Sequence, residues 1–206
     1  MSAAAELRPA LEKAAVGRFL HLALCPPAPG RQADLRAIAA ELPQGEIEGV
    51  EDLLKATDEE VAAEGFRLIG PAGVVPISAS NYIEGGYADM GPILGDIAGF
   101  HKAFGFESTL AESPDHFAAL FEFLSFLAVK EAWENAEGDE EQAELCRDAE
   151  AKFLADHVTP YLPRFAARLA AAAPEGGHHA ALALILMQVG PEGVEAFERI
   201  RPRTEK

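Results

Sequence analysis

The sequence predicts an all-α protein that folds as a single compact domain over residues 1–206, with about nine to eleven helices and one long central loop. Apolar residues recur at the three- and four-residue spacing of a helix along most of the chain. No segment alternates strand and helix patterns in the way that a parallel sheet requires. The 206 residues, of which 49% are hydrophobic, suffice for one sizeable core.

Four helices are expected before the loop, at residues 11–22, 34–42, 46–55 and 57–68. A break rich in proline and glycine at 26–30 separates the first two. The fourth has the clearest start, because Thr57 followed by Glu60 is the pattern of a capping box. In that motif each side chain binds the backbone N–H of the other residue.

The central loop at 70–91 is the one stretch without a clear helical period. It is rich in glycine and proline, and Val74, Val75 and Ile77 within it predict a short strand. A long, partly apolar loop is uncommon in a compact domain unless it has a function. We therefore expect this loop to be a functional segment.

Helices resume after the loop and are expected at 93–104, 113–135, 140–158, 165–172 and 182–187, with a short last helix from Pro191. In the second of these, Ser113 is predicted to be the N-cap and Pro114 to occupy the first helical position. Pro160 and Pro163 are expected to break or kink the path that follows.

The charge of the chain limits its partners. Lys and Arg number 17 against 34 Asp and Glu, which gives a formal net charge of -17. Such a chain is not expected to bind nucleic acid or anionic membrane surfaces, but it suits a cationic partner such as an Arg- or Lys-rich peptide. Its longest apolar run, 180–187, is far shorter than the roughly 20 residues of a membrane span.

No motif for catalysis, metal or cofactor binding stands out. The six histidines form no HExxH pattern, Cys25 and Cys146 lie in no CxxC, and neither a P-loop nor a GxSxG is present. We therefore predict no metal and no cofactor, and the sequence contains none of these catalytic motifs. Glu6 and Glu12 interrupt the apolar N-terminus, which is unlike a secretory signal and predicts a cytoplasmic protein.

Two segments stand out, one inside the loop and one at the start of the 113–135 helix. Together, in this order and spacing, they resemble the TorD/DmsD/NarJ family of molybdoenzyme-maturation chaperones. The matching residues are Pro76, Ser80, Tyr82, Gly105, Pro114, Asp115, His116, Glu122 and Phe123, followed by the run 153–165. The run 89–96 is similar to the NarJ branch, and Pro114–His116 is similar to the TorD/DmsD branch.

The resemblance implies a helical chaperone, monomeric or homodimeric, that catalyses no reaction. Members bind the N-terminal leader of a molybdoenzyme catalytic subunit, often a twin-arginine signal, and hold the apoprotein until its molybdenum cofactor is inserted. The leader-binding residues would be Asp115, His116, Tyr82, Ser80, Pro114 and Glu122. They could form one groove only if the loop and the helix start meet in space.

Other interpretations remain open at this point. Tyr82 could anchor the loop on the core, Ser80 could be a turn residue, and Glu122 could cap a neighbouring loop. An all-α metal-dependent hydrolase would need converging ligands, for instance from His101, His116 and His157. A helical adaptor for another cationic peptide is the second alternative function.

Overall fold

A computed structural model describes residues 3–43, 47–83, 90–110 and 112–189. This part of the chain contains nine α-helices, one 3-10 turn (η1), one π-helical turn (η3) and no strand, which confirms the all-α prediction. The elements are α1 (Ala3–Leu24), α2 (Arg31–Ala39), α3 (Val50–Leu53), α4 (Asp58–Leu68), η1 (Ala79–Tyr82), α5 (Met90–Phe104), α6 (Phe117–Glu137), α7 (Glu140–Phe153), η3 (Leu154–Val158), α8 (Leu162–Ala172) and α9 (His178–Val189).

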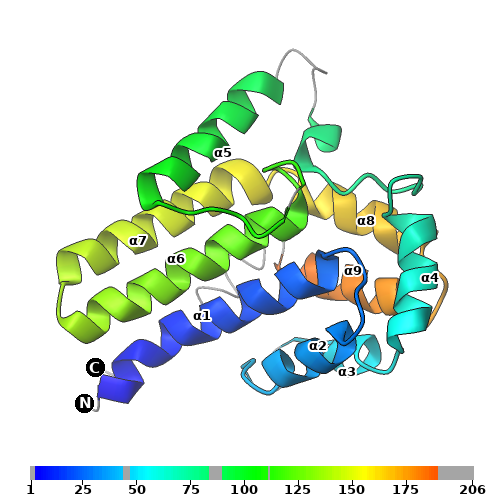
Figure 1. Ribbon diagram of the computed structural model, residues 1–206, viewed down its shortest axis with the longest axis horizontal. Helices are drawn as coiled ribbons and strands as arrows, with labels where there is room; N and C mark the ends of the chain where they lie inside the picture. Colours follow the sequence, from blue (N-terminus) through cyan, green and yellow to red (C-terminus); the bar gives the residue numbers. More distant parts are fainter. Residues whose placement is uncertain (1–2, 44–46, 84–89, 111, 190–206) are drawn as a thin grey trace.

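Helix α6 is the centre of the molecule. It lies between α1 and α7, and the three run side by side, while α4, α8 and α9 gather at one end (Figure 1). The first nine residues of α6, 117–125, are all buried, because neighbours cover this helix on every side. No described helix is both long and apolar enough to cross a bilayer.

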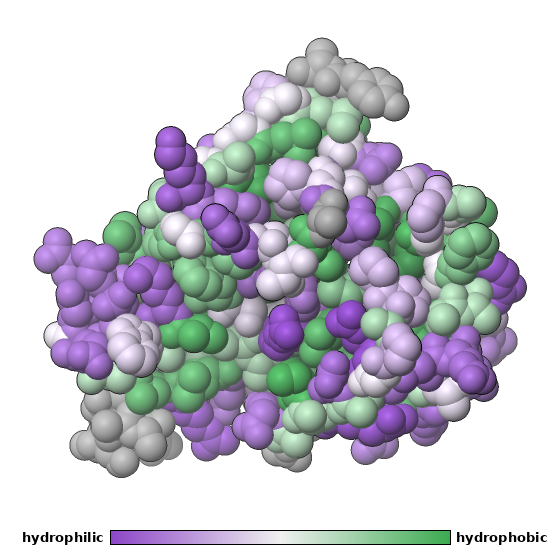
Figure 2. Space-filling view, viewed as in Figure 1, coloured by the Kyte–Doolittle hydropathy of each residue, from purple (hydrophilic) through white to green (hydrophobic). Residues whose placement is uncertain are grey.

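The opposite end of the molecule is acidic. Figure 2 shows hydrophilic residues gathered where α6 turns into α7, and Glu137, Asp139, Glu140 and Glu141 are exposed there. Gly138 makes this turn in the left-handed conformation, with a φ of 80° that favours glycine. The acid-rich stretch around α7 is therefore partly a solvated surface of the hairpin.

Several expected boundaries are wrong in detail. Helix α6 begins at Phe117, and its N-cap is His116 rather than Ser113. Pro163 does not break the chain but lies in the first turn of α8, where its missing N–H costs nothing. The capping box of Thr57 and Glu60 is confirmed, with both reciprocal bonds present. The helix expected from Pro191 lies outside the described residues.

The short strand expected from Val74 to Ile77 is absent. The described part of the loop forms only an isolated antiparallel bridge between Ser78 and His116. Pairing extends no further because each segment turns helical at once, into η1 on one side and α6 on the other. Residues 84–89 of the expected loop lie outside the described part of the chain, and α5 already begins at Met90.

Candidate functional site

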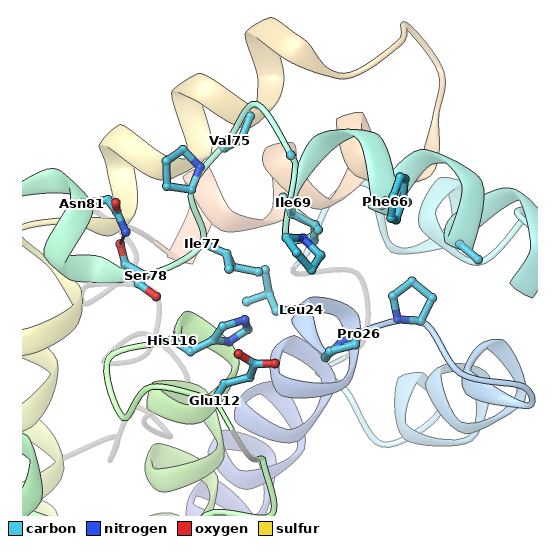
Figure 3. A pocket seen from close by; sticks show the side chains of 17 residues that line it. Leu24, Pro26, Phe66, Ile69, Val75, Ile77, Ser78, Asn81, Glu112 and His116 are labelled. Carbon is cyan, nitrogen blue, oxygen red and sulfur yellow. Dashed lines mark hydrogen bonds between the residues drawn. The ribbon is translucent and has the colours of Figure 1, made fainter.

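The candidate site is a pocket of about 690 Å³ between α4, the loop that follows it, the end of α1 and the start of α6 (Figure 3). Most of its walls are apolar, with contributions from Leu24, Pro26, Pro27, Phe66, Ile69, Val75 and Ile77. Its polar side chains are Ser78, Asn81, Glu112 and His116. Apolar walls with a few convergent polar groups are typical of ligand-binding sites.

The loop and the start of α6 meet in space, as a shared groove would require. The backbone N–H of Ala79 donates to the carbonyl of Asp115 at 2.9 Å, and that of Phe117 donates to the carbonyl of Ile77 at 3.1 Å. The two segments that carry the family resemblance are therefore joined through their backbones, on one side of the pocket.

Asp115 holds this junction together. Its side chain is only 1% exposed, and its Oδ2 accepts the backbone N–H of Ser80 at 2.9 Å. The hydroxyl of Ser113 donates to the other carboxylate oxygen. Asp115 is thus committed to bonds within the chain, and neither it nor Ser80 or Pro114 lines the pocket.

Tyr82 is buried between the loop and helices α6 and α8. It is 6% exposed, and its hydroxyl donates to the carbonyl of Pro76 at 2.7 Å. Its ring packs against Phe117 and Phe165, with centroids 6.2 and 6.1 Å away. Burial raises the pKa of Tyr82 to about 12, so the phenol stays protonated and continues to donate. Tyr82 fixes the shape of the loop without lining the pocket.

His116 does line the pocket, and its bonding defines its chemistry. Its Nδ1 accepts the backbone N–H of Ala118 at 3.2 Å, so the proton of the neutral ring is on Nε2. Burial lowers the pKa of His116, and the nearby carboxylates of Glu112 and Asp115 oppose this only in part. The neutral ring therefore offers one N–H donor, which no described residue accepts.

Glu122 lies elsewhere. Its carboxylate accepts the hydroxyls of Ser108 at 2.6 Å and Thr109 at 2.5 Å. Burial alone would raise the pKa of Glu122, but these hydrogen bonds outweigh it and hold that pKa below its usual range. Glu122 fastens the segment before α6 to that helix and does not line the 690 Å³ pocket.

Sequence reasoning missed most of the pocket residues, and two of them, Phe66 and Glu112, bear most on its chemistry. Phe66 is 65% exposed on α4, and the exposed Glu112 forms no hydrogen bond or ion pair with another described residue. A signal for Phe66 existed, because the buried positions of α4 include Val61, Gly65 and Leu68, and a large aromatic lies beside that stripe. Glu112 belongs to no sequence motif, and only the folded structure places it at the pocket.

The three histidines considered as metal ligands do not form one metal-binding cluster. His157 Nε2 lies 2.8 Å from Asp96, and His101 packs against Phe106 and Phe123. Within the described residues, no three His, Cys, Asp or Glu side chains are grouped so that they could hold a metal ion. The geometry therefore gives no support to the metal-dependent hydrolase.

The fold and the pocket define an all-α protein with an apolar cavity joined to a few polar groups. Residues 28–167, more than half of the chain, match the family described as nitrate reductase delta subunit. The chain therefore belongs to this family of molybdoenzyme-maturation chaperones of the TorD/NarJ type, which confirms the resemblance. A comparison with curated proteins gives no match.

The matched region contains most of the site. It includes α4, the loop and the start of α6, and among the pocket residues it leaves out only Leu24, Pro26 and Pro27. The matched family is of the NarJ type, to which the run 89–96 is similar, and the similarity of Pro114–His116 to the TorD/DmsD branch is not confirmed.

Proposed function

We propose that this chain is a cytoplasmic chaperone that binds the N-terminal leader of an apo-molybdoenzyme catalytic subunit in the 690 Å³ pocket and holds the subunit for cofactor insertion. One observation carries the proposal. The two segments with the family resemblance meet at an apolar pocket, which α4 and the end of α1 complete and which has the unpaired carboxylate of Glu112 and an imidazole N–H at one end. In this role the chain binds its client and catalyses no reaction.

The apolar part of the pocket suits the apolar stretch of a leader. Phe66 exposes 65% of its surface, although an aromatic side chain contributes most when it is covered. Ile69, Val75 and Ile77 line the same pocket. Aromatic and aliphatic anchors of this kind dominate the affinity of peptide interfaces, because their burial removes apolar surface from water.

The polar end suits the basic part of a leader. The Glu112 carboxylate can accept hydrogen bonds from an arginine guanidinium of the leader. A charge-assisted hydrogen bond of this type is stronger than a neutral one. The Nε2–H of His116 can donate to a peptide carbonyl. The net charge of -17 would also attract a basic peptide before contact.

The remaining sequence-predicted residues have supporting roles in this proposal. Asp115 and Ser80 would fix the loop against α6, and Tyr82 would fix it against α8. Pro114 would shape the turn before α6, and Glu122 would hold the segment that leads into it. They would affect leader binding by positioning His116 and the loop.

Phe66→Ala is expected to weaken leader binding at least about tenfold, which corresponds to about 1.4 kcal/mol, while leaving the thermal midpoint unchanged. The reason is that Phe66 is an exposed anchor that supports little of the core. Calorimetry would use a synthetic leader peptide with an Arg pair next to an apolar stretch. Trp133→Ala is the matched control, because Trp133 is also 65% exposed but lies on α6 outside the pocket. Equal losses in both variants would count against the pocket.

Glu112→Gln is expected to weaken binding of the same peptide and to flatten its dependence on salt. Attraction between exposed charges is screened over about 8–10 Å at physiological ionic strength, so the wild type should lose affinity as salt rises. Glu144→Gln is the control, since Glu144 is an exposed acid of α7. If Glu112→Gln keeps the wild-type salt dependence, the leader's basic group binds elsewhere.

Peptide specificity distinguishes the proposed chaperone from an adaptor that binds other cationic peptides. A scrambled leader keeps the composition and charge but loses the order of basic and apolar residues. The chaperone requires that order, because Glu112 and Phe66 lie at fixed places in the pocket. Equal affinity for the true and the scrambled leader would favour the adaptor.

A further inference from the structure

A second pocket, of about 310 Å³, also takes part of its lining from the 25–30 segment. It is bounded by α1, the first turn of α2 and the segment before α6. Two arginines line it, Arg18 from α1 and Arg31 from α2, together with His21, Cys25 and Asp34. Nothing in the proposed leader binding uses these side chains.

The two arginines stand apart from the other cations. Most Lys and Arg side chains among the described residues have a carboxylate or a backbone carbonyl as acceptor; these are Arg8, Lys13, Arg36, Lys55, Arg67, Lys130, Arg147, Lys152, Arg164 and Arg168. Arg18, Arg31 and Lys102 have neither within the described part of the chain. In a protein with 34 acidic residues, two of these three cations line one small pocket.

In the part of the chain that the structure describes, the surroundings of Arg31 also lack a carboxylate or carbonyl acceptor for its guanidinium. Its Nε is closed off from solvent and has no hydrogen-bond partner among the described residues. Asp58, a carboxylate at this end of α2, accepts the backbone N–H groups of Gly30 at 2.7 Å and Gln32 at 2.8 Å. The N-terminus of α2 is therefore capped by Asp58. The Arg31 guanidinium has the Cys25 sulfur as its neighbour, a weak acceptor that leaves most of its donors for a ligand.

His21 adds no positive charge to the pocket. Its Nδ1 lies 2.9 Å from the carbonyl of Ala118 and must carry the proton to donate there, while its Nε2 faces the Cys25 sulfur at 3.5 Å. Burial lowers the pKa of His21, which keeps the ring neutral. The charges that line the pocket are thus two guanidinium groups and the single carboxylate of Asp34.

We propose that Arg18 and Arg31 bind the phosphoryl group of a small molecule in this pocket. A guanidinium presents a planar fork of donors that matches the oxygens of phosphate, and two such groups match the double charge of a phosphate monoester. The volume of about 310 Å³ admits a phosphate with a small substituent. The proposal is independent of leader binding, since it uses different residues.

The test measures binding of inorganic phosphate and pyrophosphate to the full chain by calorimetry and by thermal shift, with ionic strength held constant by chloride. Both ligands should bind the wild type and raise its thermal midpoint. Arg18→Gln and Arg31→Gln should each weaken binding at least about tenfold. Lys102→Gln is the matched control and should bind normally. Asp34→Asn should bind more tightly, because it removes a carboxylate that lines the pocket and repels the anion.

Three results would overturn the proposal. The first is the absence of saturable binding in the wild type. The second is equal binding by the arginine variants and Lys102→Gln, which would indicate general attraction of anions. The third is equal binding of acetate, which would refute the phosphoryl specificity. Circular dichroism confirms that each variant is folded, and Arg31→Lys replaces Arg31→Gln if the latter is not, with weakened binding again expected because the bidentate fork is lost.

Discussion

Replacing Tyr82 by alanine is expected to lower the free energy of unfolding by about 3–5 kcal/mol, as for other buried aromatic residues. The ring of Tyr82 joins the loop to Phe117 of α6 and Phe165 of α8, and its hydroxyl binds the carbonyl of Pro76. Truncation would leave a cavity at this junction and would release the loop that lines the 690 Å³ pocket. Leader binding should weaken as a consequence.

Urea unfolding followed by circular dichroism measures this effect. Tyr82→Phe is the matched control, because it keeps the ring packing and removes only the hydrogen bond, at a cost of about 1 kcal/mol. A loss below about 1 kcal/mol for Tyr82→Ala would show that the ring is not an anchor. If leader binding then fell sharply, Tyr82 would be a direct contact instead.

Stability is expected to fall steeply as the pH drops from about 6.5 to about 4. His178 and His179, at the start of α9, are only 3% and 1% exposed, and burial lowers the pKa of each to about 4. His178 Nδ1 lies 3.0 Å from the carbonyl of Leu53, while its Nε2 is buried without a partner among the described residues. A second proton on this ring would therefore lie unpaired in the core.

The loss of stability at acid pH follows from proton uptake by the unfolded chain. Below pH 6.5 the unfolded chain protonates these histidines, whereas the folded chain does so only near pH 4, so acid favours the unfolded state across that interval. Each histidine contributes about 1.4 kcal/mol per pH unit. Burial also lowers the pKa values of His21, His101 and His116, which act in the same direction.

The measurement is the free energy of unfolding in urea at several pH values for the wild type and His178→Asn. The variant loses one titrating group, so the pH dependence of its stability should be shallower by about 1.4 kcal/mol per pH unit between pH 6.5 and 4. Parallel curves for the two proteins would mean that His178 titrates alike in both states. That result would contradict its burial as a neutral ring.

The helices were predictable from the sequence because their signals are local. The capping box at Thr57 marks α4 correctly, and the apolar spacing from Phe117 onward marks α6. The start of α6 was misplaced by the local preference of Ser113 and Pro114 for a helix N-terminus. What overrides this preference is a distant contact. The loop bonds to the backbones of Asp115 and Phe117, residues 114–115 form a turn, and His116 keeps an extended backbone as the N-cap.

The site was predictable only in part for the same reason. The motif residues mark the two segments that meet, but which side chains face inward depends on how the segments join. Asp115 is the clearest case, because an acid at a helix start suggests an exposed charge and this one binds Ser80 in the interior. Phe66 and Glu112 belong to no motif, and only the fold brings them to the same pocket.

Amide hydrogen exchange with and without the leader peptide tests the central claim, that the leader occupies the 690 Å³ pocket. With the pocket filled, exchange should slow at residues 62–81 and 112–116, which line it, and should stay unchanged along α7. The peptide is added at saturating concentration, so that missing protection cannot reflect weak binding. Protection confined to α5 or α7, with none at 62–81, would place the leader elsewhere and contradict the account.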